Sequence, residues 1–203
     1  MRSTPSFVRM TTAAGLTLLL FAVALPAAAQ AETPSEFVAT LGDSAIRMLV
    51  EEGVSPDQRI ANFRELLIEG FDVPLIGRFV LGIHWRRASP RQRTEYADLF
   101  EKFLVQSYAA RLGQYGGESL KVKAARAGGE KDTIVSTEIL QRGRPPVKVD
   151  WRVRRGEANY KVVDVIVEGI SMVITQRDEF SSVIRRSGGN VEGLLVRLRE
   201  RAD

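Results

Sequence analysis

The sequence predicts an α+β domain, in which N-terminal helices pack on one face of a curved antiparallel four-stranded meander and further helices close the chain. Two observations predict this fold class. In the first half, a Ser/Thr-Pro-x-Glu/Gln pattern occurs three times and apolar residues recur at helical spacing. After Gly116-Gly117 the apolar period changes to two, and tight-turn residues interrupt the chain. Helices followed by a run of strands are typical of α+β folds.

Each copy of the Ser/Thr-Pro-x-Glu/Gln pattern predicts the first turn of a helix. The hydroxyl accepts a hydrogen bond from the N3 amide, the Glu or Gln side chain accepts one from the N-cap amide, and proline at N1 has no donor to lose. A fourth, shorter helix is expected at 72–81, and Gly53, Gly70 and Gly113 are the expected helix stops. The three capping boxes are Thr33-Pro34-Ser35-Glu36, Ser55-Pro56-Asp57-Gln58 and Ser89-Pro90-Arg91-Gln92.

Four antiparallel strands are expected between residues 118 and 168. In the third strand, valines and a tryptophan at 147–153 alternate with charged residues, so one face of the sheet is apolar and needs a cover. The second and fourth strands alternate less regularly, and the sequence leaves their inward-facing residues open. A closing helix is expected at about 171–186, with Asn190 capping a short final one. The expected turns contain Gly128-Gly129, Gly143-Arg144-Pro145-Pro146 and Gly156.

Residues 1–31 have the features of a secretory signal peptide. Arg2 and Arg9 accompany an uncharged apolar run at 13–25, which is short for a membrane span and leads into small residues. Cleavage after Ala31 is favoured over cleavage after Ala29, because Ala29-Gln30-Ala31 matches an A-x-A signal. An uncleaved N-terminal anchor is the less favoured alternative.

The expected mature chain, residues 32–203, is long enough for one domain with its own core. Its segments are expected to be helical at 32–117, a sheet at 118–168 and helical at 169–203. After the signal peptide no other apolar run reaches membrane-spanning length, so this domain is expected to be free in solution.

Composition excludes several functional classes. The sequence contains no cysteine, which rules out disulfides, a thiol nucleophile, a cysteine metal site and a lipid-modified cysteine. Loss of the two arginines of the signal peptide lowers the formal charge from +4 to +2, which gives no reason to expect nucleic acid as a partner. The segment 118–168 is mildly basic. A solvated strand face explains this excess about as well as attraction to anionic lipid headgroups does.

The sequence contains no recognisable catalytic or cofactor-binding motif, so no catalytic residue, metal ligand or cofactor is assigned. His84 is the only histidine, and its place just past a helix end favours a loop or packing residue over a general base. Asp150 is interpreted as a surface charge. Asp164 lies between valines and is the one candidate for an isomerase-type general base, but a structural ion pair with an arginine such as Arg177 is favoured.

Several stretches together resemble the MlaC/toluene-tolerance family of periplasmic phospholipid-binding proteins. The resemblance covers essentially all of the expected mature chain, in order, and its joint spacing is more specific than any one motif. The residues that carry it are Phe71-Asp72, Val80-Leu81-Gly82, His84-Trp85-Arg86, Ser89-Pro90, Phe100 to Tyr108, Tyr160 to Val165, Glu168-Gly169-Ile170-Ser171, Arg177 and Phe180.

The resemblance implies an NTF2-like-looking fold and a periplasmic carrier of the Mla lipid-asymmetry system, not an enzyme. Such a carrier moves phospholipid between an outer-membrane lipoprotein complex and the substrate-binding subunit of an inner-membrane ABC transporter. Its acyl chains are held between sheet and helices while the headgroup stays in water. A hopanoid-associated carrier of the same family is the alternative that the sequence leaves open, and the Asp164 isomerase is a more distant one.

The expected lipid-binding residues are apolar positions of the helices and of the third strand. Helical residues from 79 to 108 are expected to lie opposite the strand, with weaker candidates on the fourth strand and the closing helix. From the sequence alone, the stripe from Tyr96 to Tyr108 is ordinarily core, and the resemblance favours a lining role for part of it. The candidates are Phe79, Phe100, Phe103, Leu104, Tyr108, Val147, Val149, Trp151 and Val153, and the weaker ones are Tyr160, Val162, Phe180 and Ile184.

Overall fold

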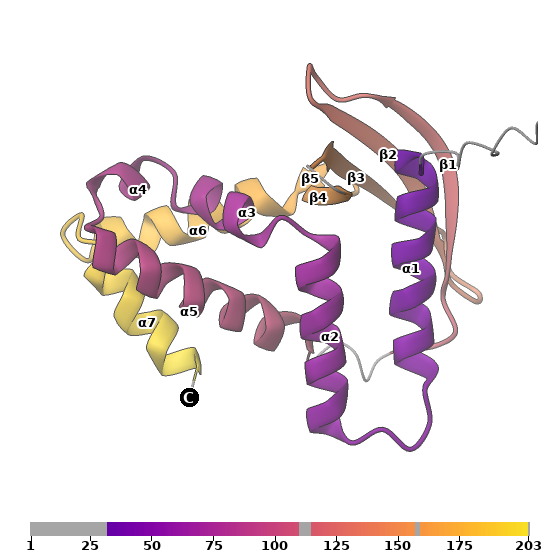
Figure 1. Ribbon diagram of the computed structural model, residues 1–203, viewed down its shortest axis with the longest axis horizontal. Helices are drawn as coiled ribbons and strands as arrows, with labels where there is room; N and C mark the ends of the chain where they lie inside the picture. The colour runs from indigo at the N-terminus through magenta and orange to yellow at the C-terminus, as the bar shows by residue number, and fades with distance from the viewer. Residues whose placement is uncertain (1–31, 110–114, 157–158, 203) are drawn as a thin grey trace, which may run out of the picture. The chain divides into compact units, whose positions relative to one another are not determined.

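The computed structural model describes residues 32–109, 115–156 and 159–202 (Figure 1). The predicted signal peptide and the helix stop at Gly113 lie outside the described residues, and cleavage after Ala31 stays a prediction. Seven helices and five strands are assigned in the described ranges. The helices are α1 (Pro34–Val50), α2 (Pro56–Gly70), α3 (Val73–Leu81), α4 (Ile83–Arg87), α5 (Pro90–Ala109), α6 (Met172–Arg186) and α7 (Glu192–Ala202). The strands are β1 (Ser119–Ala127), β2 (Asp132–Leu140), β3 (Val147–Arg155), β4 (Tyr160–Val167) and β5 (Ile170–Ser171).

The predicted capping boxes form, two of them completely. At α1, Thr33 accepts from the Glu36 amide and the Glu36 carboxylate accepts from the Thr33 amide at 2.8 Å. The same exchange joins Ser89 and Gln92 at the start of α5. At α2, the Ser55 hydroxyl accepts from the Gln58 amide, but the Gln58 side chain donates to Asn62 and does not complete the box. Local sequence therefore sets where these helices begin.

The strands form one antiparallel sheet in the order β1-β2-β3-β4-β5, which confirms the meander and adds a two-residue fifth strand. The sheet is curved (Figure 1), and the pairing register shifts at two places, between Val122 and Ala124 and between Arg152 and Val153. Such irregularities bend a strand and raise its twist. The second shift leaves Val163 as an extra residue on β4, which accounts for the irregular alternation that hid the inward-facing residues of that strand from the sequence.

Most of the buried side chains belong to a helical cluster formed by α3, α5, α6 and α7 with the end of α2. Tyr96 is fully buried in it and its hydroxyl donates to the Gly77 carbonyl at 3.0 Å, while burial raises the pKa of that hydroxyl. The Tyr96 ring stacks on Phe100 at 5.6 Å between centroids, and Phe103 meets Phe180 edge-on at 5.3 Å. These aromatic contacts add to the area that the cluster buries.

A second, smaller sheet cluster lies between α1 and the inner face of the sheet. Phe37, Val38 and Leu41 of α1 supply its helical side, and Gly42 approaches Leu120 of β1 so closely that a side chain there would require a shift. The strands supply the buried residues Val135, Val153 and Val162, with partly buried Leu120, Val122, Trp151, Tyr160 and Val165. The inward-facing residues that the sequence left open thus include Val135 on β2 and Val162 on β4.

The C-terminal end of α2 is bonded to β4. The Lys161 ammonium donates to the carbonyls of Ile68 and Glu69, at 3.0 and 2.6 Å, and the Asp72 amide donates to the Val162 carbonyl. A cation at a helix C-terminus satisfies carbonyls that have no intrahelical partner. At the other end of α2, Arg59 donates to the last carbonyls of α1, those of Met48, Leu49 and Glu51.

The outer face of the sheet is charged and internally paired. Asp132 receives two hydrogen bonds from the Arg154 guanidinium, and these lower the pKa of the Asp132 carboxyl. Asp150 lies 3.7 Å from Arg126, as its interpretation as a surface charge predicts. The mildly basic strand segment is thus at least partly engaged in ion pairs within the sheet.

Candidate lipid-binding site

Most of the predicted lining residues lie on two sides, the helical cluster and the sheet, and of those on the sheet Val147 and Val149 are not members of the sheet cluster. On the helical side Phe100, Phe103, Phe180 and Ile184 are buried and Leu104 is partly buried. On the sheet side Val149, Val153 and Val162 are buried, while Val147, Trp151 and Tyr160 are partly buried. The other two predicted residues, Phe79 and Tyr108, are exposed, at 45% and 37%.

The expectation that α5 faces the third strand is wrong, because α1 covers the sheet instead. Phe37 of α1 packs on Tyr160 with 6.1 Å between ring centroids, and Val38 and Leu41 belong to the same cluster. The helix α5 packs on α7, α2 and α3. Sequence analysis had one signal for α1, the helical spacing of Phe37 and Leu41, but spacing shows which face is apolar and not which partner it meets.

Phe71 connects the two clusters, since its side chain packs against both. It follows directly after α2 and pairs with Val162 of β4 as an isolated parallel bridge, and its ring lies 6.5 Å from that of Trp151. On α2 itself, Phe63 packs with the helical cluster and Leu66 with the sheet cluster. The helix α2 and Phe71 therefore form the boundary at which residues from both groups of predicted lining meet.

The Thr137 hydroxyl lies within the apolar face of the sheet, and it both donates and accepts a hydrogen bond there. The buried Thr137 hydroxyl donates to the Val149 carbonyl at 2.9 Å and accepts from the Trp151 indole at 3.0 Å. Buried hydroxyl and indole groups carry a large cost unless they are hydrogen-bonded. This pair holds the Trp151 ring in place and leaves its apolar surface toward the sheet cluster.

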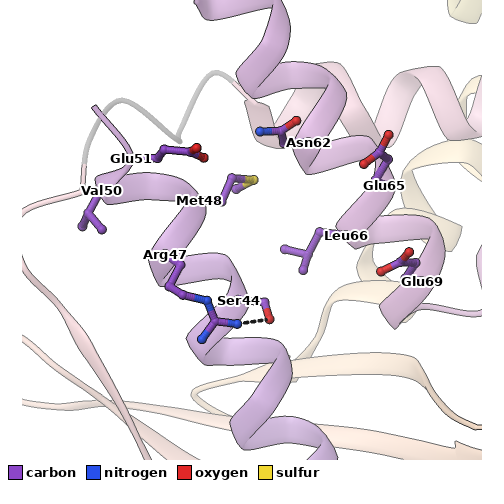
Figure 2. Close-up of a pocket in the computed structure, with 9 residues that line it drawn as sticks. All are labelled: Ser44, Arg47, Met48, Val50, Glu51, Asn62, Glu65, Leu66 and Glu69. Carbon is purple, nitrogen blue, oxygen red and sulfur yellow. Dashed lines mark hydrogen bonds between the residues drawn. The ribbon is translucent and has the colours of Figure 1, made fainter. Parts of the chain in front are cut away.

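A groove of about 530 Å³ lies between α1 and α2 (Figure 2). Its size falls within the range of small-molecule sites. Met48 and Leu66 point into it, and Leu66 also contacts the sheet cluster, so the apolar floor continues toward the sheet. The rim is polar, and the Arg47 guanidinium there donates to Ser44 at 2.8 Å. The lining residues are Ser44, Arg47, Met48, Val50, Glu51, Asn62, Glu65, Leu66 and Glu69.

This groove differs from the space that the sequence predicted. The expected site lies between the sheet and residues of α5, whereas the groove lies beside the sheet cluster, between the two N-terminal helices. None of the predicted lining residues is among the nine that line it. Met48 and Leu66 were missed because each lies on a helix face that reads as ordinary core.

The Asp164 carboxylate has a structural role at the start of α6. It accepts from the Ser171 hydroxyl at 2.7 Å and from the Val173 amide at 3.3 Å, and negative charge is favourable at a helix N-terminus. The expected pairing with Arg177 is not what the structure shows, because the Arg177 guanidinium lies 5.2 Å from the Phe79 ring.

His84 belongs to the short helix α4 and not to a loop, but its predicted role in packing is confirmed, since it is only 6% exposed. Burial lowers the pKa of His84, and the positive charges of Arg87 and Arg185 lower it further. Its Nδ1 atom has no hydrogen-bond partner among the described residues. In those same parts of the chain, no group of three or more His, Asp or Glu residues could hold a metal ion.

Within the described residues, no helix is both long enough and apolar enough to cross a membrane.

Known proteins share both the sequence pattern and the fold. The chain is 21% identical to the intermembrane phospholipid transport system binding protein MlaC of Haemophilus influenzae, over 92% of this chain and 91% of that protein. It is 26% identical to the toluene tolerance protein ttg2D of Pseudomonas putida over 107 residues, which span 53% of this chain and 50% of that protein.

A solved phospholipid-binding protein from Ralstonia solanacearum, described in complex with a phospholipid, has the same fold. The two structures align with a TM-score of 0.74 at 24% sequence identity, over 83% of this chain and 96% of the other. The sequence model of the family described as "MlaC protein" matches residues 42–200, which include every helix and strand from α2 to α6 and most of α1 and α7. The chain therefore belongs to the MlaC family.

Proposed function

We propose that this protein is a periplasmic phospholipid carrier that shuttles lipid between outer-membrane and inner-membrane ABC transporter complexes and so maintains outer-membrane lipid asymmetry. Its partners are then a phospholipid with buried acyl chains, an outer-membrane lipoprotein complex and the substrate-binding subunit of the transporter. The observation that carries the proposal is the family membership, together with a fold shared with a protein solved in complex with a phospholipid.

The acyl chains are proposed to lie where the two clusters meet, beside α2 and Phe71. There the apolar floor of the groove continues through Leu66 to the partly buried Trp151 and Tyr160. Chains that enter this boundary reach residues of both clusters, which is how the predicted lining on α5 and α6 could contribute alongside β3 and β4. The polar rim of the groove leaves the headgroup in water.

Apolar burial explains why a carrier is needed and why it can release its cargo. Burying one methylene contributes about 0.8 kcal/mol, so an acyl chain of about sixteen carbons resists transfer into water by roughly 13 kcal/mol. A protein lining of comparable apolarity offsets most of that cost without holding the lipid more tightly than a bilayer does. Because an acyl chain offers only methylenes for recognition, headgroup identity should matter little.

Native mass spectrometry of protein purified from the periplasmic fraction of a Gram-negative host tests the proposal. The expected result is a mass increase equal to one phospholipid, identified after extraction by its headgroup and chains. A hopanoid in the extract would instead support the alternative carrier. Protein that never carries lipid, even after incubation with phospholipid vesicles, would contradict a carrier function.

A further inference from the structure

Three apolar side chains at the junction of α3, α4 and α6 are exposed to solvent. Phe79 lies in the last turn of α3, Ile83 is the first residue of α4, and Ile174 lies in the first turn of α6. Their side chains are 45%, 51% and 53% exposed, respectively. Isolated exposed apolar residues are normal, but a group of neighbouring ones marks an interaction surface. These three residues are called the α3/α6 patch below.

The members of the patch are neighbours in space. The Arg177 guanidinium lies 5.2 Å from the Phe79 ring, and its Nε lies 3.1 Å from the position that a Gly82 side chain would occupy. Ile83 follows Gly82 directly, and Ile174 lies one helical turn before Arg177 on the same face of α6. Arg177 therefore lies among the three apolar residues, and α3 packs along α6 (Figure 1).

The charge around the patch has one predominant sign. Between residues 73 and 94 the chain has five arginines and no carboxylate. Arg86 and Arg87 are exposed and lie one turn after Ile83 on α4, so they border the patch. Arg78 is exposed as well and lies over the Trp85 ring at 6.0 Å. Asp178 of α6 is a nearby acid, and the arginines outnumber it.

We propose that the α3/α6 patch docks the protein on the headgroup layer of an anionic lipid bilayer. Exposed Phe and Ile side chains can enter the boundary between headgroups and acyl chains, while arginines around them reach the phosphates. The three apolar residues project from the ends of separate elements, and a fluid headgroup layer accepts such residues without a matching shape. This inference goes beyond the carrier function and does not require it.

Flotation with lipid vesicles tests the patch. Wild-type protein from the periplasmic fraction is expected to bind vesicles of phosphatidylethanolamine and phosphatidylglycerol more strongly than vesicles of phosphatidylcholine, and less strongly as salt is added. The double variant Phe79→Ser, Ile174→Ser should lower the partition coefficient at least about tenfold. The double variant Arg86→Ser, Arg87→Ser should lower it about fivefold for each arginine, on anionic vesicles only.

Two control variants match these changes elsewhere in the chain. Ile60→Ser and Val196→Ser remove side chains of similar exposure from α2 and α7, and Arg142→Ser with Arg144→Ser removes two exposed charges from the turn between β2 and β3. Their partition should equal that of the wild type. Equal loss in the controls, equal binding to both kinds of vesicle, or binding that needs a reconstituted membrane protein would overturn the proposal.

Bound lipid is measured in the same samples, which separates this proposal from the carrier function. Patch variants should retain any co-purified lipid, because the patch lies apart from the lining residues of the groove. Protein without lipid that still binds anionic vesicles through the patch would contradict the carrier function alone. Protein with lipid that ignores vesicles would contradict the docking surface alone.

Discussion

The helical cluster and the sheet cluster differ in how fully their side chains are buried. Among the described residues, the helical cluster has 17 buried members and 7 partly buried ones, whereas the sheet cluster has 6 buried and 7 partly buried. Large-to-small changes in fully buried positions leave cavities, but partly buried side chains can move. The comparison indicates that the helical cluster is the more completely packed of the two, and the more loosely packed sheet cluster borders the boundary at which we propose that the acyl chains lie.

The largest expected effect on stability is in the helical cluster. Phe100→Ala removes a buried ring that contacts Tyr96, Phe103 and Phe180, and it should lower the free energy of unfolding by about 3–5 kcal/mol. Urea denaturation followed by circular dichroism measures the loss. The matched change Phe37→Ala in the sheet cluster should cost less, and an equal or greater cost there would contradict the comparison.

A smaller loss of stability should follow from lowering the pH, through the buried side chain of His84. Because the pKa of His84 is lowered in the folded protein, the neutral form is favoured there and stability is complete only above about pH 6.5. As the pH falls below that value, unfolding is increasingly favoured, because the unfolded chain binds the proton more readily. The urea midpoint measured between pH 7 and pH 5 should fall in wild type and fall less in His84→Gln. Parallel curves would show that His84 does not contribute.

Removing the N-cap of α5 or of α1 should lower the free energy of unfolding by about 1 kcal/mol in each case, but the two changes should affect different parts of the protein. Ser89→Ala removes the cap of α5 and should lower global stability without reducing lipid retention. Thr33→Ala removes the cap of α1, which covers the sheet, and should also accelerate amide hydrogen exchange in that helix. Hydrogen exchange read by mass spectrometry compares the two. Identical exchange in α1 for both variants would remove the distinction.

The smallest expected change in stability accompanies the largest expected change in lipid binding. Leu66→Trp should fill the floor of the groove and displace bound lipid while changing the free energy of unfolding by less than about 1 kcal/mol, since the groove has room. Ile68→Trp, on an exposed position of the same helix, is the control and should retain lipid. Retention by Leu66→Trp, measured by native mass spectrometry, would place the acyl chains elsewhere.

Features set by neighbouring residues could be predicted from the sequence. The capping boxes at Thr33 and Ser89, the short helix α3 and the order of the four long strands depend on local hydrogen bonds and on periodicity, and the structure confirms them. Family membership was equally accessible, because it depends on the order of many packing residues along the chain.

Features set by contacts between distant segments could not be predicted. That Phe37 and not Phe100 faces the sheet is decided by packing between segments far apart in the sequence, and a shared apolar period carries no such information. The inward-facing residues of β4 were hidden because the register shifts at Arg152 and Val153. The groove could not be predicted because Met48 and Leu66 become neighbours only when α1 and α2 pack side by side.

The bonds from Lys161 to the end of α2 give that helix a fixed pivot. With Ile68, Glu69 and Asp72 tied to β4, any rotation that preserves these bonds has its axis near them. Displacement then grows along the roughly 20 Å of helix toward Pro56. Because Arg59 ties that far end to the last carbonyls of α1, which itself packs on the sheet, α2 is anchored at both ends, and any separation of α1 from α2 that widens the groove would have to break the Arg59 hydrogen bonds.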